Sequence, residues 1–241
     1  MQYFILVLLI CLFIFLYCVY VLANDDFIFL RRDVTMEKLF NIIFLGSFVS
    51  LFTARLFYGF FHARSIFSGP LAFMLFPYFP GLSLLGGVVG AGAYLLFIKK
   101  SRENLLPLGR ISDFFSIAFL ISLCVGFIGF LLFSEEGMDM VKISFLAILY
   151  FILFIVFLKF FLSRLLTGKF KEGTISLLFL ICFSLINLIS NAFSKISILD
   201  YLKNFENIIL ILILFLSVGV IIWRENLLLK LTKLRKGKNG A

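Results

Sequence analysis

The sequence predicts an all-α, polytopic integral membrane protein with seven transmembrane helices, its N-terminus outside and its C-terminus inside. Its 241 residues are 63% hydrophobic and 15% charged, with a mean hydropathy of +1.15, which is too apolar for a soluble domain of this length. The charged residues fall almost entirely between long apolar runs. A bilayer core needs roughly 20 apolar residues of helix, and backbone amides in lipid must bond within their own segment.

Seven such runs follow one another without an internal repeat, so residues 1–241 are predicted to form a single membrane domain. The first run has no basic start and no small-residue cleavage site after it, so we interpret it as a retained helix and not as a signal peptide. The runs are Tyr3–Ala23, Leu39–Phe61, Gly81–Ile98, Ile111–Phe133, Ile143–Leu162, Thr174–Phe193 and Ile208–Trp223.

The few polar side chains inside these runs are candidates for pairing or function. The second run contains Arg55, and a charge within a membrane helix is costly unless it is paired or reaches the surface. The fifth run contains Lys159 near its inner end, where the side chain is expected to snorkel to the interface. In the sixth run, Asn187 and Asn191 are four residues apart and share a helix face. We expect them to face the helix bundle and to form hydrogen bonds there.

The distribution of positive charge predicts the orientation. With the N-terminus outside, sixteen of the 22 lysine and arginine residues fall in the inner loops and tail, and four fall in the outer loops. This split obeys the positive-inside rule. The net charge of +9 therefore indicates contact with a membrane surface and not with nucleic acid. Residues 224–241 are predicted to be a basic cytoplasmic tail.

One connection, residues 62–80, differs from the others. It is nineteen residues long, lies outside in this topology, and carries three of the four prolines together with many aromatic residues. Proline stops a continuous helix, and aromatic side chains prefer the headgroup layer. We interpret the segment as an arm lying along the outer membrane face; an ordinary ordered loop is the alternative.

The cysteines indicate no metal or redox site. They lie inside apolar runs, with no CxxC pair and no cluster with the single histidine, His62. Small buried thiols are the expected role. No metal and no cofactor is predicted. The cysteines are Cys11, Cys18, Cys124 and Cys182.

Four stretches carry a family resemblance: Thr53–Tyr58, Pro80–Gly90, Leu108–Phe114 and Val125–Glu135. In this order and spacing the chain resembles bacterial prolipoprotein diacylglyceryl transferase. The family motif Gly-Met-Ser-Phe-His-Gly-Gly corresponds to residues 81–87 of this chain, and the glycines, the serine and the spacing match. The resemblance implies a seven-helix protein of the bacterial cytoplasmic (inner) membrane with its N-terminus outside. The family moves a diacylglyceryl group from phosphatidylglycerol to the cysteine thiol of a lipobox.

Most polar positions of the family's site are replaced here by neutral residues. The family histidine is Leu85, the arginine of its fourth helix is Phe127, and one asparagine is Phe130. In the sixth helix, the family arginine and glutamate correspond to Asn187 and Asn191. With the N-terminus outside, these positions lie in the outer halves of their helices, together with the retained Arg55 and Glu135. The resemblance places the lipid headgroup there.

The retained residues define a candidate site. Glu135 aligns with a family glutamate and is the candidate catalytic acid or base; the alternative is a solvated loop acid. Arg55 is the candidate phosphate partner, and its alternative is snorkelling. Tyr58 is either a headgroup donor or an interfacial tyrosine. Gly86 and Gly87 either contact the headgroup or permit close helix packing, which we favour.

The sequence is compatible with three functions. The first is a prolipoprotein diacylglyceryl transferase with a diverged site. The second, which the lost polar groups favour, is a non-catalytic lipid- or lipoprotein-binding protein on the same scaffold. The third is a small-solute transporter, for which no internal symmetry is seen. The expected partners are phosphatidylglycerol or a similar anionic lipid, and prolipoprotein signal peptides.

Overall fold

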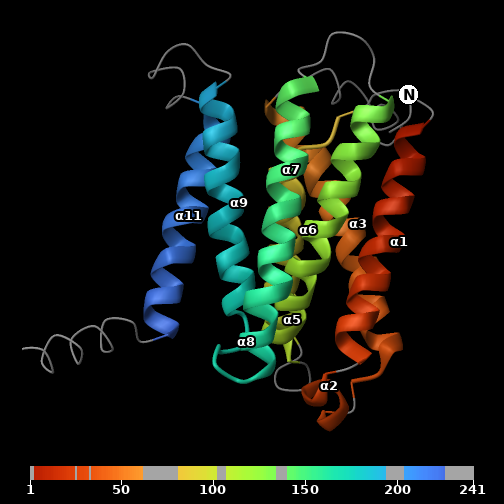
Figure 1. The fold of residues 1–241 in the computed structure, drawn as a ribbon, viewed down its shortest axis with the longest axis vertical. Coiled ribbons are helices and arrows are strands. Elements are labelled where there is room, and N and C mark those ends of the chain that lie inside the picture. Colours follow the sequence, from red (N-terminus) through yellow and green to blue (C-terminus); the bar gives the residue numbers. More distant parts are fainter. Residues whose placement is uncertain are drawn as a thin grey trace, which may run out of the picture. The chain divides into compact units, whose positions relative to one another are not determined.

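The computed structural model describes residues 3–24, 26–32, 34–61, 81–101, 107–133, 140–193 and 204–225. Within these ranges the chain is helical and contains no strand (Figure 1). The helices are α1 (Tyr3–Asn24), α2 (Phe27–Arg31), α3 (Met36–Phe61), α5 (Leu84–Ser101), α6 (Leu108–Phe133), α7 (Met140–Val156), the π-helical segment η2 (Phe157–Leu162), α8 (Ser163–Leu166), α9 (Thr174–Phe193) and α11 (Phe205–Arg224).

Six helical segments of the described ranges are long and apolar enough to cross a membrane, which confirms the all-helical, multi-pass membrane class. The run predicted from Gly81 forms α5, an 18-residue helix that carries Lys99 and Lys100 in its last turn and is not among these six. The six segments are Ile5–Asn24, Met36–Phe61, Leu108–Leu132, Met140–Leu166, Thr174–Ala192 and Phe205–Arg224.

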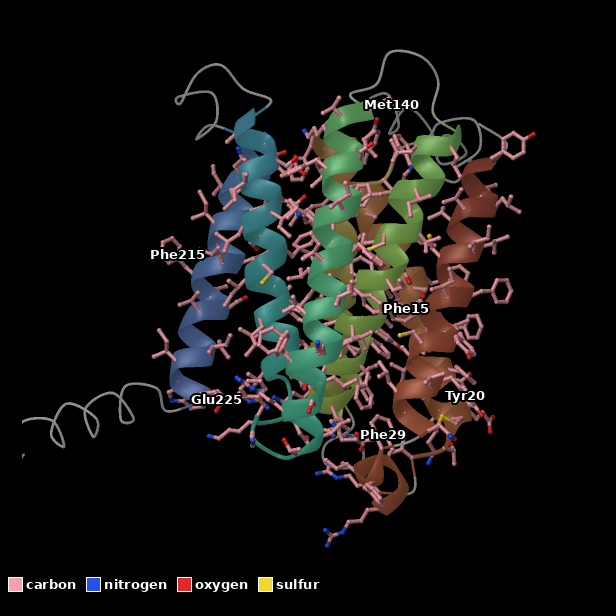
Figure 2. All side chains as sticks on the ribbon, viewed as in Figure 1. Phe15, Tyr20, Phe29, Met140, Phe215 and Glu225 are labelled. Atoms are coloured by element: carbon pink, nitrogen blue, oxygen red, sulfur yellow. The ribbon has the colours of Figure 1, made fainter. Side chains whose placement is uncertain are left out.

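The surfaces of these helices are apolar, as expected where lipid replaces water. Phe13, Phe48 and Phe215 are large hydrophobic side chains that are mostly exposed. Figure 2 shows Phe215 projecting away from α9, the helix that packs on its own helix α11. Burial against neighbours therefore cannot explain the apolar composition, whereas a hydrocarbon solvent can.

The chain divides into two compact units, residues 1–155 and 156–241. Unit 1 contains two closely packed helix pairs, α1 with α6 and α3 with α5. In the first pair, a Cβ added at Gly129 would lie 2.7 Å from Val7 Cγ1. Across the same pair, Cys11 Sγ donates to the Ser122 carbonyl at 3.4 Å, and Ser122 Oγ donates to the Cys11 carbonyl at 3.2 Å. Small residues thus let these helices approach and bond, as membrane helices commonly do.

Unit 2 is built on the pairing of α9 with α11. Toward one end of the pair, Asn191 Nδ2 donates to Asn207 Oδ1 at 2.9 Å, and Asn207 is buried. At the other end, Thr174 Oγ1 donates to Glu225 Oε1 at 2.9 Å. Polar side chains therefore join both ends of an otherwise apolar helix pair, which sets its register.

Candidate lipid-headgroup site

Arg55 is fully buried within unit 1 and does not snorkel. Its Nη1 donates to the carbonyl oxygen of Gly81 at 2.9 Å, joining the last turns of α3 to the chain just before α5. The half-buried Tyr58, one turn further along α3, interacts electrostatically with the guanidinium group. The buried-cation interpretation of Arg55 is the one that the structure supports.

Gly81 is required at the point where Arg55 and Tyr58 meet the chain. Its φ of 146° favours glycine, and an added Cβ would lie 2.1 Å from Tyr58 Cε1. The Tyr58 ring therefore lies directly over the Gly81 backbone, whose carbonyl Arg55 holds. Arginine, tyrosine and glycine thus form one compact unit at this end of the α3–α5 pair.

The α5 N-terminus begins immediately beside this unit. Ser83 donates its backbone amide to the Ala54 carbonyl at 3.0 Å and accepts, through Oγ, the Gly86 amide at 3.2 Å. The Gly87 amide donates to the Ser83 carbonyl at 3.0 Å. Ser83 is therefore an ordinary helix cap, and the amides of Gly86 and Gly87 are bonded within the first turn of α5.

Gly86, Gly87 and Gly90 of α5 face α3 at short range, which supports the close-packing interpretation. A Cβ at Gly86 would lie 2.6 Å from Phe57 Cβ and 2.8 Å from the Thr53 carbonyl oxygen, and one at Gly90 would lie 1.8 Å from Thr53 Oγ1. Ser50 Oγ donates to the Gly87 carbonyl at 2.9 Å across the same contact. The two helix backbones approach each other only because these positions lack side chains.

The positions that the resemblance aligns with the family's histidine and arginine hold apolar, packed side chains. Leu85 is 2% exposed. Phe127 stacks on the buried Tyr150 of α7, with ring centroids 5.7 Å apart and an interplanar angle of 11°. Phe130 is 37% exposed and contributes no polar group. Neither proton transfer nor charge pairing is available to these three side chains.

Asn187 and Asn191 belong to α9 of unit 2 and differ in what they bond. Asn187 Nδ2 donates to the Phe183 carbonyl of its own helix at 2.8 Å, whereas Asn191 bonds to Asn207 of α11. The predicted hydrogen bond to a second helix is thus seen for Asn191. Glu135, His62, the arm 62–80 and residues 226–241 of the basic tail lie outside the described residues, so the roles predicted for them stay predictions.

A buried ion pair at the other end of unit 1 was not predicted from the sequence. Arg110, in the first turn of α6, donates through Nε to Asp26 Oδ2 at 2.8 Å, and its Nη2 lies 2.7 Å from the same oxygen. The other carboxylate oxygen accepts the Ile28 amide at 2.7 Å at the start of α2. Both charged residues are buried, and the Arg110 guanidinium lies 5.6 Å from the ring centroid of Phe114. In the sequence, the signal for this ion pair was an acid after the first apolar run, Asp26, and an arginine just before the fourth, Arg110.

Chemically, the described part of the candidate site offers a buried cation and a phenol but no evident proton acceptor. A guanidinium binds phosphate oxygens well, and a phenol can donate to them. Among the described residues, no group of three or more histidine, cysteine or acidic side chains could hold a metal ion.

No protein-family model matches the chain, and no curated protein matches it. The resemblance in Thr53–Glu135 therefore rests on the residues quoted above.

Proposed function

We propose that this chain is a non-catalytic membrane protein that binds phosphatidylglycerol, or a similar anionic lipid, on a scaffold resembling prolipoprotein diacylglyceryl transferase. The observation that carries the proposal is the contrast within unit 1. A guanidinium group that can bind phosphate is present, since Arg55 is buried beside Tyr58. The positions that would supply proton transfer and a second cation, Leu85 and Phe127, are apolar and packed.

Transfer of a diacylglyceryl group to a lipobox cysteine would need more than lipid binding. Alkylating a lipobox thiol requires a thiolate, so a group must accept its proton, and the phosphate leaving group needs positive charge beside it. Leu85 can do neither task, and Phe127 cannot pair with a phosphate. Prolipoprotein signal peptides are the second proposed partner, held in the same region without being modified.

Residual diacylglyceryl transfer is the second candidate function, and one specific feature favours it. Glu135 is retained at the position of a family glutamate, in register with Gly126 and Gly129. A carboxylate there would be the candidate acid or base.

The proposal includes seven spans, with α5 as the third, an external N-terminus and the bacterial cytoplasmic membrane as location. A reporter fused after Ala241 should be cytoplasmic, and one inserted within residues 62–80 should be external, because the positive charge is concentrated on the inner side. Alkaline phosphatase and fluorescent-protein fusions measure this. Opposite outcomes at both fusion sites would refute the topology.

Lipid binding is tested with a photoactivatable phosphatidylglycerol and the full chain in phosphatidylcholine nanodiscs. Crosslinks mapped by mass spectrometry should fall on the segment around Thr53–Phe61. Arg55→Gln should lower this crosslinking about tenfold or more, since a hydrogen bond to a charged group contributes about 1.5–3 kcal/mol. Tyr58→Phe should lower it less while keeping the ring over Gly81.

The matched control is Lys38→Gln, which removes one exposed cation from the first turns of the same helix. It should leave crosslinking at Thr53–Phe61 unchanged. Thermal unfolding of each variant shows whether the fold is kept. Equal loss in Lys38→Gln and Arg55→Gln would contradict a specific role for Arg55.

A further inference from the structure

A second cationic feature lies in unit 2, where a π-helical segment interrupts a transmembrane helix. The span Met140–Leu166 is α-helical to Val156, π-helical from Phe157 to Leu162, and α-helical again over Ser163–Leu166. Lys159 lies inside the π segment and Arg164 lies just after it, and both side chains are exposed. Single π-helical turns in α-helices are frequently found at functional sites.

The π segment changes which side chains share a face. In an uninterrupted α-helix, two residues five positions apart lie about 140° from each other around the axis. A π segment adds one residue, and about three of the five steps from Phe157 to Leu162 lie between Lys159 and Arg164, so the separation falls to about 80°. The π segment therefore brings Lys159 and Arg164 closer together around the helix axis than an uninterrupted α-helix would.

Aromatic rings flank the two cations. The Arg164 guanidinium lies 5.9 Å from the ring centroid of Phe170, and the Lys159 ammonium lies 6.0 Å from that of Phe160. Phe170 is itself placed by Phe161, with ring centroids 6.2 Å apart. The rings hold the cations by cation–π attraction without neutralising them.

The acidic side chains that the structure describes do not form ion pairs with Lys159 or Arg164. The nearby Glu225 accepts the hydroxyl of Thr174 and the backbone amide of Lys171. Lys169, whose amide bonds to the Arg164 carbonyl at 3.0 Å, adds a further exposed positive charge. The surface can therefore take an anion.

The position of the pair along the span indicates where that anion comes from. Lys159 is seven residues before the end of the span at Leu166, about 10 Å along the axis, and neighbouring exposed side chains such as Phe160 are apolar. A ligand that contacts both cations must place its negative charge at the headgroup layer and its apolar part against Phe160. Membrane phospholipids combine these two properties.

We propose that Lys159 and Arg164 form a binding site for the phosphodiester group of an anionic phospholipid, with Phe160 against its glycerol and acyl region. This site is separate from the Arg55 region and does not depend on the function proposed for that region. It uses unit 2 alone. Exposure of both cations means that their replacement should leave the fold intact.

The test uses the full chain in phosphatidylcholine nanodiscs with photoactivatable phosphatidylglycerol, and reads the crosslinks on residues 157–170. K159Q/R164Q should lower them at least fivefold, and each single variant should lower them severalfold. The matched control K99Q/K100Q removes two exposed cations from the last turn of α5 and should have little effect. An equal loss in the control would overturn the proposal, because it would show a response to total charge only.

Two further arms test the register and the source of the anion. Leu158→Lys combined with Lys159→Leu keeps the net charge but turns the ammonium about 100° away, so crosslinking should fall as in K159Q/R164Q. Full crosslinking in this variant would refute joint binding by the cations at positions 159 and 164. An excess of inorganic phosphate or glycerophosphoglycerol should not displace the lipid. Displacement by either would show a site for soluble anions, and equal crosslinking by photoactivatable phosphatidylcholine would also overturn the proposal.

Discussion

Gly86→Val should separate α3 from α5 and lower the free energy of unfolding by about 3 kcal/mol, near the upper end of the usual cost of overpacking. The reason is that the new side chain would meet backbone and not a movable side-chain end. An added Cβ at Gly86 lies 2.8 Å from the Thr53 carbonyl oxygen and 2.9 Å from Ala54 Cα. Denaturant titration in detergent micelles measures the loss.

The same helix supplies a matched control for this substitution. A Cβ at Gly92 meets no atom within 4 Å, so Gly92→Val changes helix propensity equally but creates no clash. Its stability should stay within about 0.5 kcal/mol of the unaltered protein. If Gly86→Val and Gly92→Val were equally stable, the close packing of α3 on α5 would be contradicted.

Asp26→Ala should cost about 3–5 kcal/mol, because it removes the carboxylate that forms the buried ion pair with the Arg110 guanidinium. It also removes the acceptor for the Ile28 amide at the start of α2. Glu37→Ala is the matched control, since Glu37 is an exposed acid in the first turn of α3 and should cost less than about 0.5 kcal/mol.

A double replacement separates a lost charge partner from a lost packing volume. Asp26→Leu with Arg110→Met removes both charges and keeps most of the buried volume. It should recover much of the stability lost in Asp26→Ala, as replacing a buried ion pair by apolar residues often does. A double variant less stable than Asp26→Ala would show that the ion pair contributes through contacts other than its charge.

Composition and glycine spacing predicted the helical membrane architecture because both reflect local requirements. A hydrocarbon solvent demands long apolar helices, and the runs appear as helices in the structure. Small residues at Gly86 and Gly87 predicted close helix contacts, and added Cβ atoms there would lie 2.6 Å from Phe57 Cβ and 3.3 Å from Ser50 Oγ of the facing helix. The partner of each glycine could not be predicted, because spacing along one helix carries no information about the other.

The charged residues were harder to interpret from the sequence. Arg55 could either snorkel or be buried, and only its tertiary contact with the Gly81 carbonyl distinguishes the two. Arg110 was counted as a loop charge, although it is paired with Asp26, 84 positions earlier in the chain. The π segment at Phe157–Leu162 also gave no sequence signal, because a run whose only charged residue is Lys159 has no polar face whose register could reveal an extra residue.

The most direct test of the non-catalytic assignment is expression of the unaltered chain in bacteria depleted of their own prolipoprotein diacylglyceryl transferase. Lipid-modified lipoprotein is measured by mass spectrometry, with an active transferase expressed to the same level as control. We expect no modification by the unaltered chain. Leu85→His with Phe127→Arg should bind phosphatidylglycerol better but show little or no turnover, because Asn187 and Asn191 remain neutral. Substantial modification by the unaltered chain would contradict the account, and its persistence after Arg55→Ala and Glu135→Gln would place the active site elsewhere.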